Sequence, residues 1–184
     1  LRGGNWSNNQ AKSGGGLSLT DVNLSMTDVN WADNEAMEAG GHLFAEGGVI
    51  DVNNTYATGG RAEKRGGAYA IYESSVSILN GGYTDNRTLS TAGVGGALYL
   101  EGNGNSSIST ISVTDSYAAV RGGGIAVVDG GSTVFQSTFT SNESAEGGAL
   151  HHNGDLTLLV DTSTFLDNIA TKFGGAIYWD PNAG

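Results

Sequence analysis

Short stretches of alternating hydrophobic and polar residues recur along the chain, and each follows a pair of glycines. The third and fifth residues after the first glycine of a pair are mostly apolar: Leu17 and Leu19, Tyr69 and Ile71, Leu98 and Leu100, Ile125 and Val127, Ile177 and Trp179. A period of two separates the side chains onto two faces of an extended segment, so each stretch is predicted to be a β-strand. Alternation over residues 22–26 and 107–113 predicts further strands.

The glycine pairs divide the chain into repeats of nearly constant length. They begin at Gly14, Gly40, Gly66, Gly95, Gly122, Gly147 and Gly174, with spacings of 25 to 29 residues. Such a period is typical of stacked repeats. Because each repeat is extended, we predict an all-β fold: a right-handed parallel β-helix of about seven coils of about 26 residues. We expect residues 1–184 to form a single domain. Because the pattern reaches both ends, we also expect this domain to be a fragment of a longer repeat chain.

A second marker, aromatic-x-x-Asn, recurs between the glycine pairs. It begins at Trp6, Trp31, Tyr83, Phe139 and Phe165, whereas the corresponding positions in two other repeats are read as Tyr56 and Val113. We expect the aromatic side chains to stack inside the coils. The asparagines are expected to tolerate left-handed backbone and to form hydrogen bonds at a column of bends, and glycine to allow a sharp turn into each first strand.

The composition indicates a folded chain with an acidic surface. Glycine supplies 31 of the 184 residues, but 38% of residues are hydrophobic and recur at fixed offsets, which argues against a disordered linker. The net charge of −11 disfavours binding to nucleic acid and to anionic membranes. No apolar run approaches the ~20 residues of a membrane span. The lack of cysteine excludes disulfides and thiolate metal sites.

Six Asn-x-Ser/Thr sequons are present, which is a mild excess for this composition. They favour a secreted protein if the source is eukaryotic. Four of them are candidates for glycosylation: Asn5, Asn23, Asn53 and Asn105.

The paired motifs Gly-Gly-Ala-Ile/Leu and Phe-x-x-Asn resemble the repeat of the polymorphic outer-membrane proteins, a family known from chlamydial surface autotransporters. Residues 139–142, 147–150, 165–168 and 174–177 match closely, and earlier coils match loosely, with His42 or Gly124 in place of alanine. The resemblance implies a β-helical passenger at the cell surface or outside the cell. It also implies a role in adhesion or in building a surface structure, and it implies no catalytic residues.

The sequence contains no clear catalytic motif, so we expect no enzymatic activity. β-Helices that cleave carbohydrates need clustered aspartates with a basic residue nearby, and here no two aspartates are adjacent. We interpret Arg61, Lys64 and Arg65 as a solvated loop. His151 and His152 are neighbours in one predicted strand, so they point to opposite faces and cannot chelate one metal together. The alternative function is a carbohydrate-binding or carbohydrate-cleaving β-helix, which a carboxylate cluster in a groove would favour.

The turn that ends the strand after each glycine pair carries a polar and mostly acidic residue, six or seven positions after the first glycine: Asp21, Glu46, Glu73, Glu101, Asp129, Asn153 and Asp180. In a β-helix these residues would form a ladder along one edge. Two interpretations are open. The exposed turns simply tolerate the repulsion, or Glu46, Glu73, Glu101 and Asp129 attract calcium or a basic partner. No other cofactor is expected.

The outward side of the same strands carries small and aromatic residues. Positions two and four after the first glycine supply this strip, and its candidate interface residues are Phe44, Ala70, Tyr99, Ala126 and Tyr178. A long apolar strip favours lateral packing against another chain or domain. The open alternative is that position two lies at a bend and points inward.

No capping segment is recognisable at either end, so the terminal coils are expected to expose unpaired strand edges. We therefore expect self-association, or flanking coils of a longer chain. Other surface proteins or glycans are further candidate partners.

Overall fold

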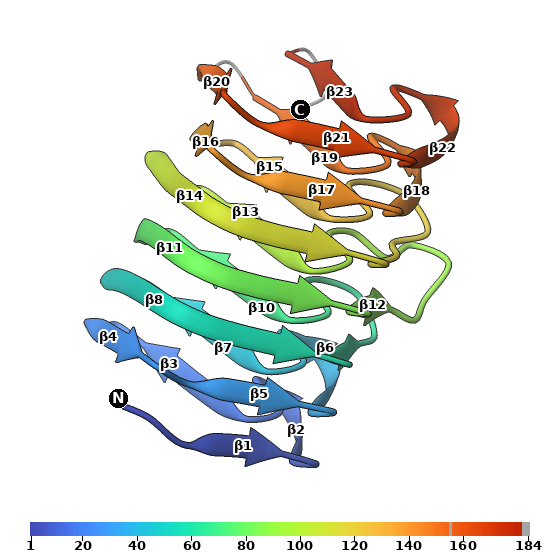
Figure 1. The fold of residues 1–184 in the computed structure, drawn as a ribbon. Helices are drawn as coiled ribbons and strands as arrows, with labels where there is room; N and C mark the ends of the chain where they lie inside the picture. The colour runs from blue at the N-terminus through green and yellow to red at the C-terminus, as the bar shows by residue number, and fades with distance from the viewer. Residues whose placement is uncertain (155, 182–184) are drawn as a thin grey trace.

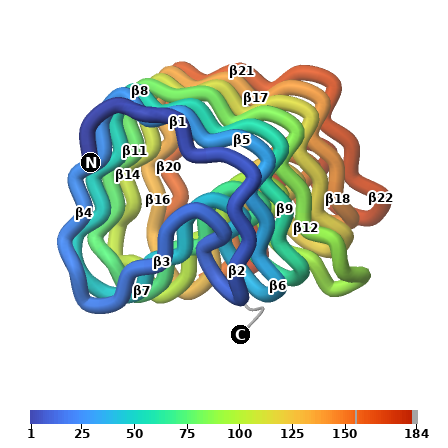
Figure 2. Tube along the Cα trace, turned by 90° about the horizontal axis from the view of Figure 1, so that it is seen from below, coloured from blue at the N-terminus to red at the C-terminus, as the bar shows by residue number. Residues whose placement is uncertain are grey.

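The computed structural model describes residues 1–154 and 156–181, which wind into a parallel β-helix of seven coils (Figure 1). Viewed from the N-terminal end, the trace turns clockwise as it recedes, so the helix is right-handed (Figure 2). All pairings between the described strands are parallel. The predicted fold class is confirmed. Within these residues no helix is long and apolar enough to cross a membrane.

The strands stack into sheets along the helix axis. The seven-stranded sheet contains the strand after each glycine pair: β3 (Leu17–Thr20), β7 (Leu43–Glu46), β10 (Tyr69–Tyr72), β13 (Leu98–Glu101), β15 (Ile125–Val128), β19 (Leu150–Asn153) and β23 (Ile177–Asp180). The ten-stranded sheet contains β1 (Asn5–Ser7), β4 (Leu24–Thr27), β5 (Asn30–Ala32), β8 (Val49–Thr58), β11 (Ser75–Thr84), β14 (Asn105–Thr114), β16 (Gly131–Phe135), β17 (Thr138–Thr140), β20 (Leu158–Asp161) and β21 (Thr164–Leu166). A four-stranded sheet contains β2 (Gln10–Ser13), β6 (Glu35–Ala39), β9 (Arg61–Ala62) and β12 (Arg87–Thr88), and β18 (Glu143–Glu146) pairs with β22 (Ile169–Phe173).

The two glycines of each pair are required for different reasons. The first glycine of all seven pairs has a φ of 59° to 68°, in the left-handed region that favours glycine. In the first six pairs the second glycine lies against the main chain of the next coil, so a Cβ on Gly41, for example, would collide with the carbonyl oxygen of Gly67. The pair therefore turns the chain and also allows the coils to approach each other closely.

The aromatic residues of the second marker form a column inside the helix. Phe139 stacks on Phe165 with ring centroids 4.9 Å apart, and Trp6 packs on Trp31 at 5.3 Å. The predicted stacking is confirmed for these coils.

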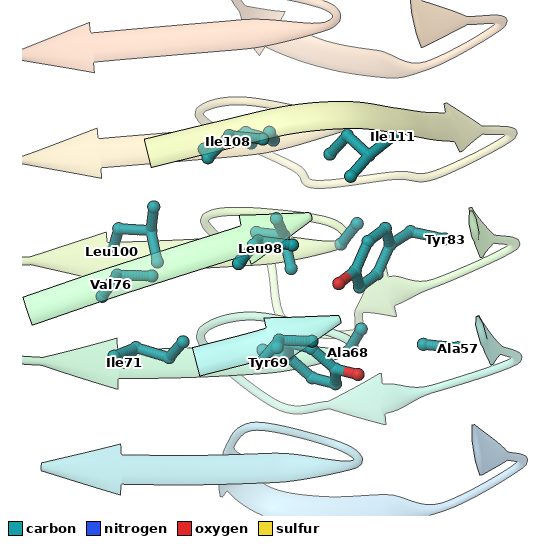
Figure 3. Packing of buried hydrophobic residues seen from close by; sticks show 14 of the residues in the cluster. Ala57, Ala68, Tyr69, Ile71, Val76, Tyr83, Leu98, Leu100, Ile108 and Ile111 are labelled. Carbon is teal, nitrogen blue, oxygen red and sulfur yellow. The ribbon is translucent and has the colours of Figure 1, made fainter. Parts of the chain in front are cut away.

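One coil fills this column with a residue from a different strand. The register places Ala57, rather than Tyr56, beneath Tyr83, and the Tyr56 side chain is exposed. Reading Tyr56 as the aromatic of this coil was therefore wrong. Tyr69 reaches into the vacant volume from β10: its ring packs edge-on against Tyr83 at 5.3 Å, and its hydroxyl lies 3.4 Å from Thr55 Oγ1 (Figure 3).

The asparagines of the marker tie each coil to the preceding one. Asn168 Oδ1 accepts a hydrogen bond from the main-chain N–H of Asn142 at 3.0 Å, and its Nδ2 donates to the carbonyl oxygen of Phe139 at 2.9 Å. The left-handed residue of the bend is the one before the asparagine, Asp167 with a φ of 51°. The prediction of a hydrogen-bonded asparagine column is thus confirmed, but the left-handed backbone was assigned one residue too late.

A buried histidine completes the asparagine column where Gly60 interrupts it. Asn34 Nδ2 donates to His42 Nδ1 at 2.8 Å, and a Cβ on Gly60 would lie only 2.7 Å from His42 Nε2. The imidazole thus occupies the place of the missing side chain. Asn86 closes the gap on the other side, because its Oδ1 accepts the main-chain N–H of Gly60 at 2.9 Å. Burial lowers the pKa of His42 to about 3.

The low pKa of His42 predicts a loss of stability in mild acid. The unfolded chain binds a proton at this residue below pH 6.5, whereas the native chain does not until about pH 3, so stability falls as the pH decreases across that window. At pH 5 the expected loss from this residue is about 2 kcal/mol relative to pH 7. Urea unfolding at the two pH values measures it, and His42→Gln should reduce the difference. Equal pH dependence in both proteins would contradict the prediction.

Candidate functional site

Residues two positions after the first glycine point into the helix. Ala68, Ala97 and Ala149 are fully buried members of the main hydrophobic core. This decides the open alternative in favour of the inward orientation. In most coils the interior leaves room only for alanine or glycine at this bend, and the exception is His42, which is also fully buried and fits because Gly60 leaves space for its ring. The corresponding Gly16 illustrates the constraint, since a Cβ there would lie 2.9 Å from Cε3 of the Trp31 ring.

Residues four positions after the glycine do lie on the outer side of the seven-stranded sheet, but the chain itself covers most of them. Ala70, Tyr99 and Ala126 are 0%, 3% and 0% exposed. Ala39 and Val94, from the segments that precede the glycine pairs, pack against them. The predicted lateral interface is therefore wrong for these three residues, because their side chains are already buried within the monomer.

The acidic residues predicted to form a ladder lie in two separate columns. Glu46 and Glu101 end their strands, and the register places Tyr72 between them. Glu73 and Asp129 lie one residue later in the turn, with φ values of 47° and 50°. The prediction of one continuous acidic ladder is therefore wrong. Within residues 1–154 and 156–181 no cluster of three or more His, Cys, Asp or Glu could hold a metal ion. Calcium binding by Glu46, Glu73, Glu101 and Asp129 stays a prediction.

A groove opens beside the outer side of the seven-stranded sheet. Its first part is a hollow of about 310 Å³. The apolar lining is Ala39, Phe44 and Tyr72, and the charged lining is Glu38, Glu46, Lys64 and Arg65. The rings of Phe44 and Tyr72 are both partly exposed and lie 5.4 Å apart. In Figure 2 the chain folds back sharply between β2 and β3, which sets the four-stranded sheet at an angle to the seven-stranded sheet.

Arg65 lies at the centre of the groove. Its guanidinium carbon is 5.2 Å from the centroid of the Tyr99 ring, and its Nη1 is 3.9 Å from Glu101 Oε2. The same carboxylate oxygen accepts a hydrogen bond from the Tyr99 hydroxyl at 2.7 Å. Burial and this hydrogen bond raise the pKa of Tyr99. Burial also lowers the pKa of Arg65, but the Tyr72 hydroxyl and Glu101 outweigh it, so the net shift is upward.

A second hollow of about 500 Å³ adjoins the first and shares Lys64 and Arg65 with it. Its far wall is an inserted loop. Eight residues lie between Asn86 and Gly95, whereas five lie between Asn34 and Gly40. The loop after β12 extends away from the body of the helix (Figure 1). Ser90, Ala92 and Val94 of this loop line the hollow.

The same edge of the helix carries an ionic cluster nearer the C-terminal end. Glu146 is mostly buried and lies 3.4 Å from Arg121 Nε, 3.7 Å from Lys172 Nζ and 3.8 Å from His151 Nε2. Burial, and next the charge of Arg121, lower the pKa of His151 to about 4. Tyr178, the last candidate interface residue, is half-buried and packs on His151 at 5.6 Å. Arg121 and Lys172 therefore compensate the charge of Glu146, whereas both ring nitrogens of the buried His151 lack a hydrogen-bond partner among the described residues.

His151 and His152 lie on opposite sides of β19, as predicted. His151 is in register with Ala126 on the outer side, and His152 is in register with Val127 of the core. The arrangement brings the two imidazoles to different environments.

The four candidate glycosylation sites are exposed: Asn5, Asn23, Asn53 and Asn105. The asparagines of the other two sequons, Asn86 and Asn142, are fully buried in the asparagine column. Glycosylation at the four exposed positions stays a prediction.

The basic residues interpreted as a solvated loop are partly structural. Arg61 Nη2 lies 2.8 Å from Asp85 Oδ2, so the solvated interpretation is wrong for Arg61. Arg65 is exposed, although its guanidinium also lies over the Tyr99 ring. Lys64 is exposed, as expected. Sequence reasoning also missed Tyr72. The available signal was its position, since an aromatic residue stands there where the neighbouring coils have Glu46 and Glu101.

Comparisons with known proteins connect the repeat to one family. The model of the Chlamydia polymorphic membrane protein repeat matches residues 162–178, which include the marker at Phe165 and Asn168 and the last glycine pair. Comparisons with curated proteins and with solved structures gave no match.

Proposed function

Because this chain is a β-helix protein with repeats like those of the polymorphic membrane proteins, we propose that it is a rigid, non-enzymatic rod of a cell surface or extracellular assembly. The family that the repeat defines is one of surface and outer-membrane proteins. We further propose that the rod adheres or assembles through its sides. Its proposed partners are other surface proteins, glycans, or further coils or copies of the chain.

The main observation in support of a rigid rod is that main-chain hydrogen bonds join neighbouring coils in the turns as well as in the strands. At the glycine pairs, for example, Gly14 N–H donates to the carbonyl oxygen of Ala39 at 3.0 Å, and Gly40 N–H donates to that of Arg65 at 3.0 Å. Coils joined at every face cannot tilt independently of each other. Such a stack is suited to holding a binding face in a fixed position along the rod.

The proposed location predicts that antibodies against this chain label intact cells of the source organism. Labelling is expected because an adhesive rod must be accessible from outside. Flow cytometry of intact and permeabilised cells measures it, with a cytoplasmic protein as the control. Labelling seen only after permeabilisation would overturn the surface proposal.

The proposed adhesive role predicts that the purified chain, added in solution, competes with the attachment of source cells to their natural surface. A thermally unfolded sample of the same protein serves as the matched control. Unchanged attachment at saturating concentrations would contradict adhesion while leaving the location intact.

A further inference from the structure

We propose that the groove beside the seven-stranded sheet binds a neutral oligosaccharide along the side of the rod. This inference rests on the proposed adhesive role and gives its ligand class. The groove comprises the two adjoining hollows that share Lys64 and Arg65.

The shape of the groove favours a chain-like ligand. Its first hollow is bordered by β6 and β7, and the second continues past Arg65 to the inserted loop after β12. Both hollows are open along one side of the helix. Sites for compact cofactors are instead concave and enclose most of the ligand surface. An extended polymer can occupy two consecutive hollows without being enclosed.

The aromatic wall matches one side of a sugar ring. Phe44 and Tyr72 are both partly exposed, and their rings follow each other along the helix axis at 5.4 Å. The row continues to Tyr99, 5.5 Å from Tyr72, where Arg65 covers the ring. An aromatic face carries negative charge density, and the C–H groups on the face of a pyranose carry weak positive charge. Stacking on Phe44 and Tyr72 would therefore orient a sugar, with its hydroxyls directed to the rim.

The charged lining favours a ligand that both donates and accepts hydrogen bonds. Glu38 and Glu46 supply acceptors, and Lys64 and Arg65 supply donors, so the formal charges in the first hollow cancel. A sugar hydroxyl can donate and accept at once. The Arg65 side chain is 48% exposed and holds Glu101 only loosely at 3.9 Å, so guanidinium N–H groups remain accessible to a ligand. Because the whole chain carries a net charge of −11, a polyanionic glycan would be repelled.

Calorimetric titration of the full chain with neutral hexasaccharides of glucose, mannose and N-acetylglucosamine tests the proposal. At least one is expected to bind saturably, in the micromolar to low-millimolar range. Tyr72→Ala should weaken that binding about tenfold through loss of one stacked ring. Tyr56→Ala is the matched control, because Tyr56 is an exposed tyrosine on β8 that does not line the groove. It should bind like the unaltered chain.

Lys64→Ala provides a second variant that does not depend on core packing, since Lys64 is exposed and lines both hollows. It should weaken binding several-fold and leave the thermal midpoint unchanged. The proposal is overturned if none of the neutral hexasaccharides binds, or if Lys64→Ala and a folded Tyr72→Ala both bind like the unaltered chain. Binding of hexagalacturonate or of an extended peptide in place of the neutral sugars would also overturn it. None of these outcomes bears on surface labelling, so the two proposals fail separately.

Discussion

Replacing Gly96 with alanine is expected to destabilise the chain by about 3 kcal/mol. Gly96 is the second glycine of a central pair, and its N–H donates to the carbonyl oxygen of Gly122 at 2.9 Å. An added Cβ would collide with the carbonyl oxygen of Gly123 and with the main chain of Tyr117. The colliding atoms are all backbone atoms, so no side chain can rotate away. Relief requires the coils to separate and their mutual hydrogen bonds to lengthen.

Gly104→Ala is the matched control for this substitution. A Cβ on Gly104 meets nothing within 4 Å, and neither Gly96 nor Gly104 has a positive φ. The two variants therefore differ in the space available rather than in backbone strain. Urea unfolding monitored by circular dichroism compares them. Similar unfolding free energies for both variants would mean that the coils yield to the extra methyl group.

The second large effect is expected at Ala57 and Tyr69. Tyr69→Leu introduces the residue found at this position in several other coils, but it should cost about 3 kcal/mol because it leaves the space above Ala57 unfilled. Ala57→Phe should cost about 2 kcal/mol, because Tyr69 already occupies that volume. The paired substitution Ala57→Phe/Tyr69→Leu rebuilds the arrangement of the regular coils and is expected to recover most of the stability.

A double-mutant cycle measures this compensation directly. The expected coupling between the two sites is about 2 kcal/mol or more, far above the ~0.5 kcal/mol found for independent positions. Thermal or urea unfolding of the four proteins supplies the values. Simple additivity would show that Tyr69 does not fill the place of the missing aromatic side chain.

The parts of the fold that could be predicted from sequence are those fixed by local backbone requirements. The first glycine of a pair needs a positive φ, and the second needs the absence of a side chain, so both recur wherever a coil turns. The period of the glycine pairs and the alternation after them were sufficient to predict stacked parallel strands. The aromatic and asparagine columns could also be predicted from sequence. When repeats stack, equivalent positions of successive repeats become neighbours, so a residue type that recurs in the sequence forms a column in the structure.

The strand register inside the long strands could not be predicted in the same way. Asn54 has a φ of 50°, and a left-handed residue within a strand shifts the alternation by one position. Val52 points inward before this bend, and Thr55 and Ala57 point inward after it. A shift of one residue exchanges the two faces of a strand, and for this reason Tyr56 was chosen in place of Ala57.

The candidate site was missed because it depends on the angle between two faces of the helix. The alternation places Ala70 and Tyr99 on the outer side of their strands, and only the tertiary structure brings Ala39 and Val94 over them. The groove likewise combines Phe44 and its neighbours with residues of the following coil. No local pattern encodes such a contact between segments about one coil apart in sequence.

The interior packing limits how a chain of this kind can change its length. Tyr69 fills the space left by Ala57 of the preceding coil, and His42 fills that left by Gly60 within its own coil. A tandem duplication of residues 40–65 alone would place Leu43 above the first copy of Ala57, where Tyr69 now stands. The new junction would contain a void, although each copy would be intact. Coils in such a chain are therefore expected to be gained or lost in blocks that keep Ala57 together with Tyr69, and Gly60 together with His42.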